Sequence, residues 1–256
     1  MMGSPEITWS DPTYIIVYIC TIKLYKYIQF YLDKPAVIFY LIKKNGELMV
    51  TPSKYRITGR QLIDTIDNWE SLINFKVKLI GSGGTALTLL GIKESTKDID
   101  MIVPVQKEYE RLLTFLRSIG YQDKGNGLVH PDSPLFLFQF WAGNRVFTTE
   151  LLDSPLSPGG NILIKEWRHI YLGALNLQDL IITKMFRGTQ VDIEDCVSVF
   201  PAFEMDPESL LERYAEAAKY DLNPEKMIAN FIVLAEALLK KGIVSPDFLE
   251  KVKAYK

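Results

Sequence analysis

The hydrophobic and polar positions of this chain change period several times, and each change predicts a different element. From Ile22 to Asp33, polar residues recur every three or four positions in an otherwise apolar segment, which is typical of a largely buried helix. Two apolar runs, Val37–Ile42 and Leu48–Thr51, then flank Asn45-Gly46, a dipeptide that favours a tight hairpin. The N-terminal part is therefore predicted to be a helix and a hairpin. They form either a winged-helix-like unit or an extension packed on the next domain.

The central part alternates between helical and strand periods, which predicts a mixed sheet with flanking helices. Helices are expected at Gly59–Ile73, Thr85–Leu90 and Glu108–Ile119, and strands at Val77–Ile80, Asp98–Val103, Leu135–Trp141, Val146–Leu152 and Asn161–Ile164. The two aromatic-rich strands on either side of residues 142–145 are expected to form a hairpin. From Leu175 onward the pattern is helical, with segments at Gln178–Phe186, Ile193–Phe200, Pro207–Lys219 and Pro224–Lys241. The predicted organisation is an extension (1–58), an α/β domain (59–172) and a helical C-terminal domain (173–256).

Composition narrows the class of protein. Twenty-nine Lys and Arg against 31 Asp and Glu leave a formal charge of −2, which argues against a protein that coats nucleic acid by bulk electrostatics. Cys20 and Cys196 fit neither a disulfide framework nor a structural zinc site. The apolar run from Thr13 to Ile22 is shorter than a spanning helix and follows no basic segment. We expect a cytoplasmic protein with no membrane partner.

The segment with the clearest chemistry joins a glycine turn to a pair of aspartates. Gly81-Ser82-Gly83-Gly84 lies between a predicted strand and a predicted helix, where free backbone N–H groups favour phosphate. Asp98 and Asp100 alternate with Ile99 on a strand, so both carboxylates lie on one face, with Cα atoms about 7 Å apart. Such a pair can chelate a hard cation. An isolated pair of this kind is more often a solvated strand end, and the nearby glycine turn favours the metal-binding interpretation.

These residues resemble a known signature. Gly83-Gly84-Thr85-Ala86-Leu87 followed by Ser95-Thr96-Lys97-Asp98-Ile99-Asp100 resembles the nucleotidyltransferase (DNA polymerase β-like) fold, in which a glycine turn precedes Asp-hydrophobic-Asp. Within that fold it is most similar to abortive-infection (AbiEii-like) toxins, and next to the minimal nucleotidyltransferases that act as antitoxins. The resemblance covers about residues 59 to 200. It implies a nucleotidyltransferase-like mixed α/β sheet.

The resemblance also implies site residues. Asp98 and Asp100 would hold metal together with a third carboxylate on a later strand, best matched by Glu150, with Asp153 as the substitute. A second block, Asp179–Cys196, resembles the helix-turn-helix that follows the catalytic sheet. The implied catalytic residues are Asp98, Asp100, Glu150 and Lys184, and the implied nucleotide-binding residues are Ser82, Gly83, Gly84, Thr85, Lys184, Arg187 and Asp195.

Structural interpretations of the second block remain open. Asp192 and Asp195 can be an N-cap and a first-turn acid, Gly188 a helix stop and Lys184 a solvated residue. If instead Lys184 faces the nucleotide, Asp195 is expected to orient it.

Taken together, these features predict a Mg²⁺-dependent enzyme. It would transfer a nucleoside monophosphate from an NTP to a hydroxyl of RNA or protein, using two Mg²⁺ ions, and it could belong to a toxin–antitoxin pair. The residues leave the acceptor open among tRNA, another protein and a small molecule such as an aminoglycoside. The alternative is a nucleotide-binding or partner-binding module of the antitoxin type with little or no activity. A third hypothesis makes the N-terminal unit a DNA-binding winged helix with lysine contacts to phosphate.

Overall fold

The chain forms two compact units, Met1–Lys54 and Tyr55–Lys256, in a computed structural model that describes residues 39–44, 47–52 and 56–255. In the first unit, β1 (Phe39–Lys44) pairs antiparallel with β2 (Glu47–Pro52), and Lys44 lies opposite Glu47. The predicted hairpin is confirmed. The helix predicted at Ile22–Asp33 lies outside the described residues, so the winged-helix hypothesis stays a prediction.

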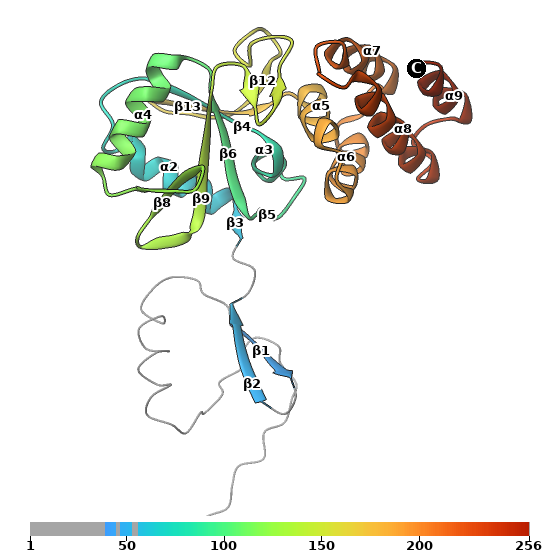
Figure 1. Cartoon of the computed structure of the whole chain (residues 1–256). Helices are drawn as coiled ribbons and strands as arrows, with labels where there is room; N and C mark the ends of the chain where they lie inside the picture. The colour runs from blue at the N-terminus through green and yellow to red at the C-terminus, as the bar shows by residue number, and fades with distance from the viewer. Residues whose placement is uncertain (1–38, 45–46, 53–55, 256) are drawn as a thin grey trace, which may run out of the picture. The chain divides into compact units, whose positions relative to one another are not determined.

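A seven-stranded mixed sheet forms the centre of the second unit (Figure 1). Its order is β12 (Asn161–Glu166), β13 (Ile170–Leu175), β4 (Val77–Gly81), β6 (Asp98–Val103), β9 (Ser133–Ala142), β8 (Gly127–His130) and β7 (Gln122–Lys124). The pairs β13–β4 and β6–β9 are parallel, and the other neighbours are antiparallel. The predicted mixed α/β class is confirmed.

Helices cover both faces of this sheet. On one face, α2 (Gly59–Glu70) and α4 (Gln106–Ser118) bury apolar side chains of β4, β6, β9 and β13. The capping box of Thr58 and Gln61 fixes the start of α2. On the other face lies α3 (Gly83–Leu89), next to the short pair β3 (Ile57–Thr58) and β5 (Ser95–Thr96).

The predicted hairpin of Leu135–Trp141 with Val146–Leu152 is wrong. Both edges of β9 are already paired, one with β6 and the other with β8, so no edge is free for a third strand. The backbone of Phe147 takes a positive φ of 54°, which breaks the second segment. That segment instead folds on itself as β10 (Arg145–Val146) and β11 (Thr149–Glu150), outside the large sheet.

Five helices follow the sheet and share one core with α3. They are α5 (Leu177–Arg187), α6 (Gln190–Phe203), α7 (Pro207–Ala218), α8 (Pro224–Lys240) and α9 (Pro246–Ala254). Each begins after a side chain that caps its first turn, namely Asn176, Thr189, Asp206, Asn223 or Ser245. The core they form includes Ala86 and Leu87 of α3, so they pack on the α3 side of the sheet (Figure 1). Among the helices described, none is both long and apolar enough to cross a membrane.

Candidate active site

The two aspartates lie on the β6 face opposite the large apolar core. Ile99 and Met101 are fully buried against α2 and α4, so Asp98 and Asp100 point to the α3 side. Asp100 is only 7% exposed, and its Oδ1 atom is buried without a hydrogen-bond partner in the described part of the chain. Burial, and then the charge of Asp98, raise the pKa of Asp100 to about 6, although Arg187 and Lys184 oppose this rise. A bound cation would satisfy this orphaned oxygen, so the residues fit a divalent metal.

The glycine turn, Gly81–Gly84, places backbone without a side chain next to Asp100. Gly83 has a φ of +55°, and a Cβ atom there would lie 3.1 Å from Asp100 Oδ2. At Gly84 a Cβ atom would lie 2.6 Å from Thr96 Oγ1, closer than such atoms approach. Ser82 is fully buried, and its Oγ atom has no partner among the described residues. The turn therefore packs its bare backbone closely against Asp100 and Thr96, and it leaves the Ser82 hydroxyl without a partner among the described residues.

Thr85 fixes the distance between the turn and β6. Its Oγ1 accepts a hydrogen bond from Asp100 N (2.9 Å) and lies 3.3 Å from Asp98 O, to which it donates. Ser82 N donates to Asp100 O at 3.0 Å. The Thr85 hydroxyl is thus bonded to backbone atoms, and its clearest role is to position the aspartates.

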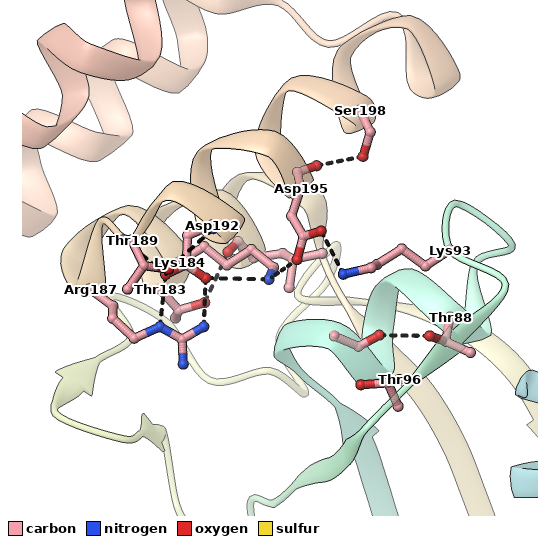
Figure 2. Close-up of polar contacts among 12 residues, drawn as sticks. Thr88, Lys93, Thr96, Thr183, Lys184, Arg187, Thr189, Asp192, Asp195 and Ser198 are labelled. Carbon is pink, nitrogen blue, oxygen red and sulfur yellow. Dashed lines mark hydrogen bonds and ion pairs between the residues drawn. The ribbon is translucent and has the colours of Figure 1, made fainter. Parts of the chain in front are cut away.

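The second block forms a buried ion-pair network next to α3 (Figure 2). Lys184 of α5, only 3% exposed, donates to Asp195 Oδ2 of α6 at 2.7 Å, and Lys93 donates to Asp195 Oδ1 at 2.7 Å. The interpretation of Lys184 as a solvated residue is therefore wrong, because the side chain is buried and paired with Asp195. The expectation that Asp195 orients Lys184 agrees with this geometry. Sequence reasoning missed Lys93, which lies far from the block along the chain.

Arg187 lies at the exposed edge of the same network. Its Nε donates to Asp192 Oδ2 at 2.8 Å, and the hydrogen bonds to Asp192 hold the pKa of the guanidinium above its usual range. The N-cap of α6 is Thr189 rather than Asp192, which is the third helical residue of a capping box. Gly188 ends α5 with a φ of +66°, as its type and position predict.

A cavity of about 360 Å³ lies between the glycine turn and the helices. Its wall consists of Gly83, Val146, Phe147, Thr148, Thr149, Thr183, Lys184, Phe186, Arg187 and Lys226. Three of these side chains are cations and none is a carboxylate, so the cavity favours an anionic ligand. The ring of Phe147 lies 4.8 Å from the ring of Trp141 and 5.6 Å from the guanidinium of Arg187. Sequence reasoning missed both Phe147 and Lys226.

The third carboxylate expected from the sequence is not brought to the aspartates. Glu150 is exposed on β11, outside the large sheet, and Asp153 pairs with Arg213 at 3.1 Å. Within the described part of the chain, no three His, Cys, Asp or Glu side chains lie close enough to hold a metal ion. On β9, the residue opposite Asp100 is Gln139.

The two histidines described here have structural contacts. Glu70 accepts hydrogen bonds from the backbone N–H groups of His169 and Ile170, and its Oε1 lies 3.0 Å from His169 Nδ1. The ring of His130 packs on Tyr121 at 5.1 Å. These contacts agree with the structural role expected for both.

No protein-family model and no curated protein sequence matches the chain. Among solved structures, it is similar to an antigenic nucleotidyltransferase-like protein from Paracoccidioides brasiliensis, with 13% identity, coverage of 73% of this chain and 94% of that chain, and a TM-score of 0.46. It is also similar to ANT(2'')-Ia in complex with adenylyl-2''-tobramycin (12% identity, 63% and 96% coverage, TM-score 0.41). For the antibiotic-resistance factor ANT(2'')-Ia in solution, the identity is 15%, the coverage 61% and 87%, and the TM-score 0.38. The roles assigned below rest on this chain's own side chains.

Proposed function

We propose that this protein transfers a nucleoside monophosphate from an NTP to a hydroxyl group of an acceptor, with RNA or protein as the acceptor class. The observation that carries the proposal is Asp100, a buried carboxylate with an unpartnered oxygen, next to the bare backbone of Gly83. The adjoining cavity has cationic walls and no carboxylate, which suits a triphosphate.

Each group has a role in this proposal. Asp98 and Asp100 hold the divalent cation, and Gly83, which lines the cavity, lets phosphate oxygens approach the backbone. The missing side chain of Gly84 instead makes room for Thr96 of β5. When bound, Mg²⁺ would neutralise phosphate charge and lower the pKa of the attacking hydroxyl. The acceptor hydroxyl gives its proton to water, and its oxygen forms a bond to the α-phosphorus. The bond from the α-phosphorus to the bridging oxygen breaks, and pyrophosphate leaves with that electron pair.

The cations of the cavity act on the triphosphate. Arg187 and Lys226 are exposed enough to contact phosphate oxygens directly. Lys184 contributes a fixed positive charge from the cavity wall, and its hydrogen bond to Asp195 holds the ammonium in place. Because Glu150 does not lie with the aspartates, Asp98 and Asp100 hold the metal without it.

The test measures whether the labelled α-phosphate of an NTP becomes attached to RNA or to protein. The full chain is incubated with Mg²⁺, one α-labelled NTP at a time, and separately purified total RNA or total protein. We expect transfer with the wild type and none with Asp98→Asn combined with Asp100→Asn. The double variant is expected to melt no lower than the wild type, because it removes a repulsive, partly buried pair of charges. Asp64→Asn, a change at an exposed position of α2, is the control and keeps wild-type transfer. Unchanged transfer in the double variant contradicts the proposal.

A second candidate is a nucleotide-binding module without transfer. It is favoured by the amide of Gln139 beside Asp100, where a third carboxylate would strengthen metal binding. Metal-dependent NTP binding without transfer to RNA or protein would select this candidate.

A place in a toxin–antitoxin pair rests on the residue resemblance alone. If the protein is a toxin, its induction in a bacterial host arrests growth, and the double aspartate variant relieves the arrest. Undisturbed growth during induction contradicts the toxin role.

A further inference from the structure

The register of β6 and β9 places an amide next to the aspartate pair. The two strands are parallel, with Asp98 opposite Leu137 and Asp100 opposite Gln139. Neighbouring strands lie about 4.8 Å apart, and residues in register point to the same face of the sheet. The alternate partners confirm the orientation, because Phe138 and Phe140 are buried with Ile99 and Met101 in the opposite core. Gln139 therefore extends to the same side as both aspartates.

The amide group of Gln139 is unpaired in the described part of the chain. Gln139 is only 7% exposed, and its side chain makes no hydrogen bond with the residues that the structure describes. Neither amide atom is among the fully enclosed polar atoms of the described chain that lack a partner, so the amide still borders space that water or an ion can enter. Asp100 beside it also has an oxygen without a partner. The two residues therefore lie side by side on one face of the sheet, with Asp100 next to Gly83.

We propose that Gln139 is the third protein ligand of the divalent cation, through its amide oxygen, and that the site holds one ion. The inference rests on the cation of the proposed function. Hard cations such as Mg²⁺ and Mn²⁺ bind amide oxygens as well as carboxylates. The ligand set of Asp98, Asp100 and Gln139 carries a charge of −2, which one divalent ion neutralises. A third carboxylate would leave excess negative charge and favour a second ion.

The test measures Mn²⁺ binding to the full chain without nucleotide, by calorimetry and by the paramagnetic resonance signal of free Mn²⁺. We expect one Mn²⁺ per wild-type chain. Gln139→Leu, which keeps the size but removes the oxygen, is expected to weaken binding about tenfold or more. Gln139→Glu is expected to tighten binding by a similar factor and to admit a second ion. Gln122→Leu, on the exposed edge strand β7, is the control and keeps wild-type affinity.

Two results overturn the proposal. One is a folded Gln139→Leu variant that binds Mn²⁺ with wild-type affinity, and the other is a wild-type chain that binds two Mn²⁺ ions with similar affinity. Melting temperatures show which variants fold, and Gln139→Glu keeps the test decisive if Gln139→Leu does not. Failure of the proposed function is distinguishable. One Mn²⁺ that depends on Gln139, with no NTP bound at saturating metal, supports the ligand and contradicts the transferase.

Discussion

At the residue scale, Lys184 shows that the role of a charged side chain depends on whether it is buried. The sequence offers two roles, a nucleotide contact or a solvated lysine. In the structure, its ammonium lies 2.7 Å from Asp195 and 3.7 Å from Asp192, and all three side chains are nearly inaccessible to water. A buried cation of this kind holds neighbouring carboxylates in place as well as acting on a ligand.

We therefore expect Lys184→Ala to destabilise the fold. Removing the ammonium leaves two buried carboxylates short of positive charge, although Lys93 and Arg187 still pair with them. The expected loss in free energy of unfolding is about 3 kcal/mol, which urea unfolding measures. An exposed lysine would change it by no more than about 0.5 kcal/mol. A loss of NTP affinity without loss of stability would contradict the structural part of this role.

Lys226 is expected to act on the ligand without affecting the fold. It is an exposed cation in the first turn of α8, it lines the cavity, and no ion pair engages it within the described residues. Lys226→Ala should weaken binding of Mg²⁺–NTP about fivefold to tenfold and flatten its salt dependence, because one phosphate contact is lost.

The matched control for Lys226 lies on the same helix. Lys240→Ala changes an exposed lysine in the last turn of α8 and is expected to leave both NTP affinity and melting temperature unchanged. Equal affinities of the two variants would exclude Lys226 from the binding site. Lys226→Arg should restore most of the affinity.

Residues close together in sequence were the ones that the sequence could assign to the site. The alternation of Asp98, Ile99 and Asp100 is a local property of a strand, so the shared face of the carboxylates could be predicted. Lys93, Gln139 and Lys226 reach the candidate site from other segments. Only strand register and helix packing bring them there, and no spacing in the sequence encodes either.

At the element scale, helix ends marked by glycine or proline were predicted better than strand partners, whereas α6 begins three residues before the predicted Ile193 and ends three residues after the predicted Phe200. Gly188, Pro207 and Pro224 mark helix ends through conformations that each residue favours by itself. The partner of a strand depends on which edges are already occupied, as Val146–Leu152 shows. The strand β13 was missed because it is buried on both sides and reads as a continuous apolar run.

The end of α5 offers a test of local strain. At Gly188 the backbone has a φ of +66°, and an added Cβ atom would lie 2.5 Å from the Asn230 amide, which donates to Met185 O at 2.8 Å. Gly188→Ala is expected to lower the free energy of unfolding by about 2 to 3 kcal/mol, because it combines an unfavourable conformation with a clash.

Gly91→Ala separates these two causes. Gly91 has a φ of +75° but nothing within 4 Å of an added Cβ atom among the described residues, so it carries the conformational cost alone, about 1 kcal/mol. Equal losses at the two glycines, measured by urea unfolding, would mean that Asn230 moves aside without cost.

At the scale of the whole molecule, the sequence predicted the order of the parts but not how they join. The boundary expected between 172 and 173 follows a change of hydrophobic period along the chain. In the structure, one apolar core extends from α3 and β13 to α9, across that boundary. The groups of the candidate active site span the same junction, since Asp100 and Gly83 belong to the sheet side, and Lys184 and Arg187 to the helices.

We expect the sheet and the helices of Tyr55–Lys256 to unfold together. Leu87 of α3 is fully buried in the shared core, and Leu87→Ala should cost about 2 to 5 kcal/mol through the lost contacts and the cavity left behind. Hydrogen exchange of the full chain, followed by mass spectrometry, measures where that loss appears. If the core is one cooperative unit, the free energy of opening falls by the same amount in peptides from β4–α3 and from α8. A loss confined to residues 59–172 would show that the helical part folds on its own, and that its side of the site is assembled by docking.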